Sequence, residues 1–221
     1  LPSVCAHTNA HIADVIVVDN GSDDNSVEVL KQEFSQVKTL LFPQNCGFAA
    51  GYNKALEMLD YKYAVLLNSD VETTPHWLEP LLEFAEDNPD VAACQPKIKS
   101  LRRREKFEYA GAAGGFIDRY GYPFCRGRIF NTLETDRGQY DDICDIFWAS
   151  GAALFVRAEI YKKVGGLDPS RTWKRSISAG ASISQDTASL SYRKARSITW
   201  EEHRSMPPIP GKPISTFATT F

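Results

Sequence analysis

Four runs of apolar residues, each ending in polar or turn-forming residues, recur at short intervals in the first 96 residues. They are DVIVVDN (14–20), VKTLLF (37–42), YAVLLNSD (63–70) and VAACQ (91–95). A short apolar run without alternation is typical of a strand buried on both faces, as in a parallel sheet covered by helices. The stretches between the runs predict helices over about 27–34, 48–59 and 75–88. Because strand and helix alternate, the pattern predicts right-handed crossovers and an α/β fold with a mostly parallel sheet.

The run that begins at Tyr63 stops abruptly at oxygen-bearing side chains. Because side chains alternate along a strand, Asn68 and Asp70 leave its carboxyl end on the same side. Ligands of open α/β sheets gather at this end, and one carboxylate there is enough to anchor Mg²⁺ or Mn²⁺ on a diphosphate. The alternative is a plain turn into the next helix, with Thr74 as its N-cap and Pro75 at its first position.

Two other segments are expected near that strand end. Asp19, like Asp70, follows an apolar run, so it is expected at the same edge of the sheet. The segment 43–53 begins as a turn and continues as a helix. Its small residues, among them Gly47, allow a ligand to approach the free N–H groups of the first helical turn. Glycines at helix starts are also common where nothing binds, so both interpretations stay open.

The character of the sequence changes after residue 96. The basic run KIKSLRRREK (97–106) suits a phosphorylated acceptor or an anionic membrane surface, and also a solvated loop. Residues 107–128 are rich in glycine and aromatic residues, which predicts irregular hairpins whose rings either stack on sugars or form a satellite core. A further strand over 145–157, interrupted by small residues, leads into a short helix over 158–164 that ends at Gly165.

Composition narrows the functional classes. A chain of 221 residues, 43% of them hydrophobic, suffices for one α/β domain with a full core. Its formal net charge of −3 argues against nucleic acid as the main partner. No charged-then-apolar leader and no run of membrane-spanning length is present, so a cytoplasmic protein is expected. The cysteines lack C-x-x-C spacing, which favours reduced thiols over a disulfide frame or a zinc site. They are Cys5, Cys46, Cys94, Cys125 and Cys144.

Taken in order, these segments resemble family 2 of the glycosyltransferases, inverting enzymes of the GT-A fold that use nucleotide-sugar donors. The resemblance is carried by VIVVDNGSDDNS, by N-x-G-F-A-x-G-x-N (45–53), by LLNSD followed by Pro75 and Trp77, and by FWASGAALFVRAEIYKKVGGLD. It is strongest to the rhamnosyltransferase-like branch that builds bacterial cell-surface polysaccharide. It implies a Rossmann-like GT-A domain whose nucleotide-sugar-binding half is 1–96 and whose acceptor-side half is 97–168.

The resemblance also implies roles for individual residues. Asp19 and Asn20 would contact the base and ribose, and Asp70 would hold Mg²⁺ or Mn²⁺ on the diphosphate. Asn68 stands at the first position of the family's usual Asp-x-Asp motif, which removes one negative charge and predicts weaker metal binding. The remaining implied contacts are the nucleotide border, Asn45, Gly47 and Asn53, and the sugar and acceptor pocket, Trp148, Ser150 and Gly151.

The function implied is metal-dependent transfer of a sugar from a UDP- or dTDP-linked donor to a cell-surface polysaccharide or lipid-linked acceptor. The location implied is the cytoplasm, at the inner face of the membrane, with peripheral membrane contact in the intact protein. Two alternatives are an inactive fragment that at most binds nucleotide and a nucleotidyltransferase. The second is disfavoured because such an enzyme is expected to carry a glycine-rich, basic phosphate loop near its start, and this sequence shows none.

The sequence departs from the family at both ends. The family's opening strand, V-V-I-x-N-Y-N in the middle of its sheet, is missing, which predicts a truncated chain with exposed apolar edge. After Asp168, relatives continue into an acidic motif resembling FFAHMEEIDLCWRL, and residues 169–221 have no counterpart of it. A one-base shift of frame over this tail can yield FAHMEEIDLCWRL, VYHVGG and NPRKTYLNFRNN. The tail is therefore interpreted as an irregular, out-of-frame translation and no catalytic base is assigned; sequencing the encoding DNA tests this.

Overall fold

The computed structural model describes residues 1–109, 111–169, 194–198 and 214–220. The chain divides into two compact units. Unit 1 comprises Leu1–His76, Val156–Thr172 and Pro208–Phe221, and unit 2 comprises Trp77–Phe155 and Trp173–Pro207. Strand β10 (Ala153–Arg157) begins in unit 2 and ends in unit 1.

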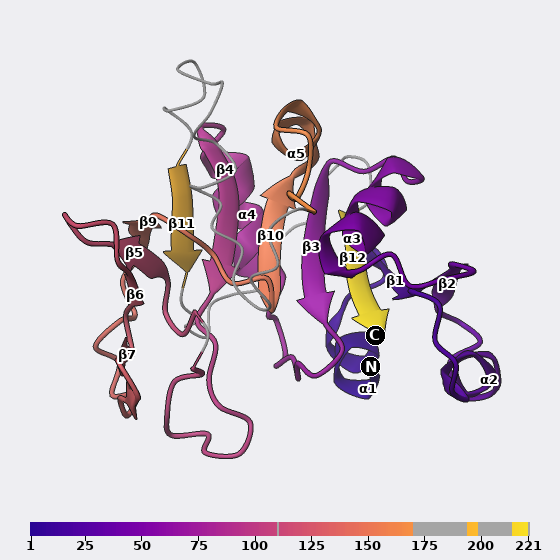
Figure 1. The fold of residues 1–221 in the computed structure, drawn as a ribbon, viewed down its shortest axis with the longest axis horizontal. Helices are drawn as coiled ribbons and strands as arrows, with labels where there is room; N and C mark the ends of the chain where they lie inside the picture. The colour runs from indigo at the N-terminus through magenta and orange to yellow at the C-terminus, as the bar shows by residue number, and fades with distance from the viewer. Residues whose placement is uncertain (110, 170–193, 199–213, 221) are drawn as a thin grey trace. The chain divides into compact units, whose positions relative to one another are not determined.

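The described part of unit 1 is built on parallel strands in the spatial order β2, β1, β12, β3. In Figure 1, β12 (yellow) lies between β1 and β3, and Thr216 of β12 is paired with both Val15 and Val65. The predicted parallel α/β sheet is therefore confirmed. The strands are β1 (Ala13–Asp19), β2 (Lys38–Leu41), β3 (Tyr63–Asn68) and β12 (Ile214–Thr220), and the helices are α1 (Pro2–His7), α2 (Ser26–Glu33), α3 (Phe48–Glu57) and α5 (Ala158–Lys163).

Burial explains why the apolar runs of unit 1 form strands. Every residue of β3 from Tyr63 to Leu67 is at most 1% exposed, and residues 16–18 of β1 are at most 2% exposed. Burying each aliphatic side chain contributes roughly 1.5–3 kcal/mol. Leu30 of α2 packs on the β1 residue Val17. The turn after β1 requires glycine, because Gly21 has φ +78° and a Cβ there would lie 2.5 Å from the Gln44 backbone.

Unit 2 contains a second group of strands. Strand β4 (Val91–Pro96) pairs in parallel with β11 (Lys194–Ile198), and β11 pairs antiparallel with β9 (Cys144–Ile146). Helix α4 (Glu79–Asp87) contacts β4, and its buried residues include Leu81 and Leu82. The predicted strand over 145–157 is thus two strands, β9 and β10, with the small residues between them forming the connection.

A separate antiparallel sheet follows β4 along the chain. Its strands are β5 (Gly115–Ile117), β6 (Pro123–Cys125), β7 (Arg128–Ile129) and β8 (Thr132–Leu133), in that order. It shares Cys125 with a cluster of buried residues whose other members are Phe107, Ala112, Ala113 and Trp148. The predicted irregular hairpins are present, and Phe107 belongs to a satellite core rather than to a sugar-stacking surface.

The start of α4 corrects a sequence prediction. The helix begins at Glu79 rather than at Pro75, and Thr74 is not its N-cap. The reason is that His76 adopts φ +57°, a left-handed conformation that an α-helix cannot include. Pro80, at the second position of α4, is the proline of the first helical turn in place of Pro75.

Strands β11 and β12 lie within residues 169–221, for which the sequence predicted an irregular tail. At these two strands that prediction is wrong, because each pairs with neighbours on both sides. Two parallel strands with a gap between them leave two rows of unpaired backbone groups, and a β-branched, aromatic segment such as ISTFATT can satisfy both rows. Residues 170–193, 199–213 and 221 lie outside the described residues, so the irregular, out-of-frame tail stays a prediction there.

Candidate functional site

The carboxyl ends of β1 and β3 meet at one edge of the unit 1 sheet. Thr219 of β12 pairs with Val18 on one side and with Asn68 on the other, and Thr220 pairs with Asp19. Because neighbouring strands lie about 4.8 Å apart, β1 and β3 are separated by roughly 10 Å at this edge. The structure therefore brings Asp19 and Asn68, predicted from separate apolar runs, to a common edge.

Asn20 fixes the loop that precedes α3. It is 2% exposed. Its Nδ2 donates to Asn45 Oδ1 at 3.1 Å and to the Gly47 carbonyl at 3.2 Å, while its Oδ1 accepts from the Cys46 N–H at 3.0 Å. Asn45 Oδ1 also accepts from the Gly47 N–H at 2.7 Å. These bonds hold the 45–47 loop beside the carboxyl end of β1. The predicted contact of Asn20 with a base stays a prediction.

Two buried oxygen atoms at this edge lack partners. Asp19 is 3% exposed, and its Oδ2 accepts from the Ser22 N–H at 3.2 Å. Asp19 Oδ1 and Asn68 Oδ1 are buried and find no hydrogen-bond partner among the residues that the structure describes. A buried acceptor left unsatisfied costs about 1–3 kcal/mol, and such atoms call for an explanation, of which a bound ligand is one. Both atoms accept hydrogen bonds, so they would suit N–H, O–H or hydrated-cation groups.

Asp70 follows β3 on an exposed loop that is held at several points. Tyr52 of α3 donates from its hydroxyl to the Leu67 carbonyl at 3.1 Å. Further along, the Thr73 N–H donates to Ser3 Oγ at 3.2 Å, and His7 Nδ1 donates to the Thr73 carbonyl at 2.7 Å. Helix α1, which carries both Ser3 and His7, therefore positions the loop after β3.

The oxygen ligands at this edge fit a lightly coordinated divalent cation. The described residues contain no group of three or more His, Cys, Asp or Glu side chains placed to hold a metal ion. Mg²⁺ needs only one or two carboxylates, because it keeps several waters and binds substrate phosphates. The role of Asp70 as the metal ligand, with Asn68 as a neighbouring amide, stays a prediction.

Asn53 holds the turn after α5. Its Oδ1 accepts from the Leu167 N–H at 2.8 Å and from the Tyr161 hydroxyl at 2.6 Å, and its Nδ2 donates to the Leu167 carbonyl at 2.8 Å. A Cβ on Gly166 would lie 2.4 Å from Asn53 Oδ1. Burial raises the pKa of Tyr161 far above its ordinary value, so its hydroxyl stays a donor. In the structure, the Asn53 side chain stabilises the turn at Leu167. The predicted contact of Asn53 with a nucleotide stays a prediction.

In unit 2, Gln95 connects segments that the sequence analysis treated separately. Gln95 is 0% exposed. Its Oε1 accepts from the Ser150 N–H at 2.6 Å, and its Nε2 donates to the Gly111 carbonyl at 2.8 Å. Gln95 is a functional candidate that the predicted site residues do not include. The local signal for it is that Gln95 closes an apolar run in the same way as Asn68.

The residues predicted to shape an acceptor pocket are buried. Trp148 is 5% exposed, and its Nε1 donates to the Phe116 carbonyl at 3.0 Å. A Cβ on Gly115 would lie 2.0 Å from the Trp148 ring. Ser150 is 0% exposed, and its Oγ accepts from the Ala152 N–H at 3.2 Å; Gly151 is also buried. These contacts describe packing, and acceptor binding by these residues stays a prediction.

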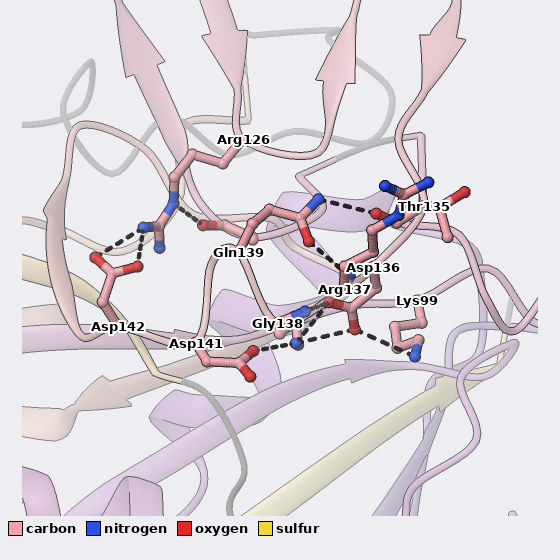
Figure 2. Close-up of polar contacts among 11 residues, drawn as sticks. Lys99, Arg126, Thr135, Asp136, Arg137, Gly138, Gln139, Asp141 and Asp142 are labelled. Atoms are coloured by element: carbon pink, nitrogen blue, oxygen red, sulfur yellow. Dashed lines mark hydrogen bonds and ion pairs between the residues drawn. The ribbon is translucent and has the colours of Figure 1, made fainter.

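Part of the basic run is neutralised inside unit 2. Lys97 forms ion pairs with Asp136 at 2.9 Å and with Asp141, and Lys99 pairs with Asp136 at 3.2 Å. Figure 2 shows this network beside the pair of Arg126 with Asp142. Burial would raise the pKa of Asp136, but hydrogen bonds from Lys97, the Gly138 N–H and Lys99 hold it below its ordinary value. Lys97 and Lys99 therefore anchor the 134–142 segment, whereas residues 102–104 are exposed, as in a solvated loop.

Solved structures share the fold of this chain. GalNAc-T7 in complex with UDP, GalNAc and Mn²⁺ has a TM-score of 0.55 at 15% identity, over 76% of this chain and 33% of that chain. Residues 1–349 of TarS from S. aureus have a TM-score of 0.55 at 12% identity, over 97% of this chain and 55% of that chain. These identities show the fold alone, which is the GT-A fold that the sequence predicted.

The sequence comparisons then show the family. The family model described as Glycosyl transferase family 2 matches residues 3–164, which is more than half of the chain. The chain belongs to this family, and the resemblance seen in its motifs is confirmed.

Two curated relatives illustrate how far the similarity extends. YibD, an uncharacterized glycosyltransferase of Escherichia coli (strain K12), is 35% identical over 85 residues, which are 37% of this chain and 24% of YibD. The N-acetylglucosaminyl-diphospho-decaprenol L-rhamnosyltransferase of Mycobacterium tuberculosis (strain ATCC 25618 / H37Rv) is 24% identical over 169 residues, 70% of this chain and 55% of that protein. The chain thus spans between 24% and 55% of the length of these relatives.

Proposed function

We propose that this chain forms the donor-binding part of an inverting glycosyltransferase that takes a sugar from a UDP- or dTDP-linked donor. The observation that carries the proposal is the pair of unpartnered buried oxygens, Asp19 Oδ1 and Asn68 Oδ1, at one sheet edge. The loop held by Asn20 beside that edge adds backbone N–H groups at the start of α3. Carboxylate and amide oxygens would meet the base and ribose, and N–H groups would meet the diphosphate.

Asp70 would hold Mg²⁺ or Mn²⁺ in this site. When bound, the cation stabilises the negative charge of the departing nucleoside diphosphate. Asp19 Oδ1 would accept from a base N–H or a ribose hydroxyl, and the 45–47 loop would keep the nucleotide against the ends of β1 and β3. Because Asn68 replaces a second carboxylate, the site would bind the cation weakly and depend on the donor phosphates to complete its coordination.

The transfer itself needs an acceptor hydroxyl and a base. The hydroxyl oxygen would bond to the anomeric carbon while the bond to the diphosphate breaks, and a carboxylate would take the hydroxyl proton. No described residue is assigned as that base. The M. tuberculosis relative is named for a lipid-linked N-acetylglucosaminyl-diphosphate substrate. By analogy we propose a saccharide or lipid-linked saccharide acceptor at the inner face of the cell membrane. Among the described residues of this chain, no helix is long and apolar enough to cross a bilayer.

One observation favours a second candidate, a fragment that binds nucleotide without transferring sugar. The family match ends at residue 164, and the sequence after Asp168 lacks the acidic motif that would supply the base. In that case the donor edge in unit 1 would still bind UDP or dTDP with Mn²⁺, but the anomeric carbon would not react.

The two candidates separate in one assay. The full chain is incubated with UDP- and dTDP-linked sugars and Mn²⁺, with and without a lipid-linked saccharide acceptor, and released nucleotide is measured beside donor binding. Acceptor-dependent release supports the transferase, and saturable binding without release supports the fragment. Absence of both would overturn the donor site itself.

A further inference from the structure

The small sheet of unit 2 has two unlike faces. One face lies on the satellite core, since Cys125 is 3% exposed and Gly115 contacts the Trp148 ring. On the other face, Phe116 and Phe124 are paired across β5 and β6, and their rings stack with centroids 5.6 Å apart. Because Cys125 is paired with Arg128 and side chains alternate along each strand, Ile129 lies on the same outer face as Phe124. The outer face is therefore a continuous apolar row across the strands.

One end of the same sheet carries aromatic side chains that point into solvent. The turns β5–β6 and β7–β8 lie at the same end, because successive strands of the sheet run in opposite directions. Tyr120 and Tyr122 in the first turn are 70% and 71% exposed, and Phe130 in the second turn is 90% exposed. We name these three residues the aromatic tip. Monomeric surfaces seldom gather large apolar groups in this way unless they are used in binding.

The tip is held in place by its own backbone. Asp118 Oδ1 accepts from the N–H groups of Tyr120 and Tyr122 at 2.8 and 2.9 Å, and the Asp118 N–H donates to the Tyr122 carbonyl at 3.0 Å. Phe130 has φ +51°, a left-handed conformation that is costly for an aromatic residue. Asp118 thus fixes the turn that carries Tyr120 and Tyr122, and the N–H groups of these two residues already have partners.

The turn that carries Tyr120 and Tyr122 also carries a cation. Arg126 of the same sheet is paired with Asp142 and lies in the turn at the opposite end, so the positive charge beside the tip comes from Arg119. Arg119 lies over the Tyr120 ring, 4.6 Å from its centroid, and donates to the Tyr120 hydroxyl at 2.6 Å. A guanidinium is therefore placed directly beside the exposed rings.

We propose that the aromatic tip binds the surface of an anionic lipid bilayer. Tyrosine rings favour the interface between headgroups and acyl chains, and arginine is attracted to anionic headgroups. Phe130 and the apolar row behind the tip would enter the acyl boundary, and the satisfied turn N–H groups would lower the cost of leaving water. This inference goes beyond the donor site: it concerns unit 2 alone and does not depend on nucleotide binding.

Vesicle co-sedimentation of the full chain tests the proposal. The vesicles are phosphatidylcholine alone or phosphatidylcholine with phosphatidylglycerol, at low and high NaCl. We expect binding to the anionic vesicles that weakens with salt, and a loss of about tenfold or more in the partition coefficient for the combined change Tyr120→Ser, Tyr122→Ser and Phe130→Ser. Arg119→Gln should cost about fivefold on anionic vesicles and little on neutral ones.

The control variant removes exposed apolar groups elsewhere. Leu41→Ser with Met58→Ser changes residues of unit 1 that are 48% and 60% exposed, and it should leave vesicle binding unchanged. Circular dichroism and the midpoint of thermal unfolding should match the parent chain for every variant, because all these side chains are exposed. Equal binding by the parent chain and the tip variant, or no binding by the parent chain to anionic vesicles, would overturn the proposal. Binding of free saccharide to the tip in place of lipid would overturn it too.

Discussion

Asparagine shows how one residue type takes on different work at the same sheet edge. The family resemblance predicts that Asn20 contacts the base and ribose and that Asn45 and Asn53 border the nucleotide. In the structure Asn20 clamps the 45–47 loop and Asn53 clamps the turn at Leu167. An amide that can accept and donate at once serves a backbone segment as readily as a ligand. The spacing along the chain does not distinguish the two, because Leu167, the backbone partner of Asn53, lies 114 residues away.

The clamp at Asn53 yields a graded prediction. Tyr161→Phe removes one hydrogen bond and should lower the free energy of unfolding by about 1 kcal/mol. Asn53→Ala removes three and leaves Leu167 backbone groups unsatisfied, so it should cost more, about 2–3 kcal/mol. Urea unfolding at neutral pH measures both. Exposed Asn131→Ala is the matched control, with an expected change below about 0.5 kcal/mol. A larger loss for Tyr161→Phe than for Asn53→Ala would contradict the assigned contacts.

Single elements were predictable where their signal is local. The apolar runs became β1, β3 and β4 because burial on both faces leaves a continuous hydrophobic pattern. The ion network around Lys97 was not predictable, because Asp136 and Asp141 are about forty residues further along the chain. Sequence alone gave a basic run that could face solvent, phosphate or a membrane. Folding assigned two of its lysines to internal acids and left the arginines outside.

The network makes stability depend on pH in a definite direction. The pKa of Asp136 is lower in the folded chain than its ordinary value, so its contribution is complete above an ordinary aspartate pKa, about 4, and is lost as the pH falls through the lowered value. At pH 7, Asp136→Asn should therefore lower the free energy of unfolding by about 2 kcal/mol. The difference between variant and parent should shrink below pH 4. Urea titrations at both pH values measure this.

Asp142 provides the comparison for that experiment. Its side chain is 60% exposed although it pairs with Arg126 at 2.9 Å. An exposed ion pair is worth less than about 1 kcal/mol, so Asp142→Asn should have a smaller effect than Asp136→Asn. Equal losses in the two variants, or a loss for Asp136→Asn that stays constant down to pH 3, would show that the buried network is not the source.

At the scale of the whole molecule, family and fold class were predictable and the closure of the sheet was not. The motifs lie at strand ends and helix starts, positions that a GT-A fold brings together. The order of the motifs along the chain was therefore enough to predict the fold class. The pairing of β12 with β1 and β3 had no local signal, because its nearest partner in sequence, β3, ends at Asn68 and β12 begins at Ile214. The candidate site in unit 1 was half predictable: Asp19, Asn68 and Asp70 follow from apolar runs, whereas the clamp of Asn20 on the 45–47 loop depends on contacts between segments about 25 residues apart. In unit 2, the contacts of Gln95 with Gly111 and Ser150 likewise join distant segments.

Strand β12 gives a prediction for the fold as a unit. Thr216 pairs with both Val15 and Val65, so Thr216→Pro would remove a backbone donor from the middle of the sheet. The free energy of unfolding should fall by about 3 kcal/mol or more. Thr216→Ala keeps the N–H and separates this loss from that of the side chain. If the two variants unfold at the same denaturant concentration as the parent chain, the tail does not contribute a central strand.

The most direct test of the central claim is a calorimetric titration of UDP and dTDP into the full chain, with and without Mn²⁺. We expect saturable binding at one site that requires Mn²⁺, and a loss of affinity of about tenfold or more for Asp70→Asn. Asp14→Asn, at the opposite end of β1 and paired with Lys38, should bind as the parent chain does. Binding that ignores Mn²⁺, equal losses in both variants, or no saturable heat from the parent chain would contradict a donor site at the carboxyl edge of the sheet.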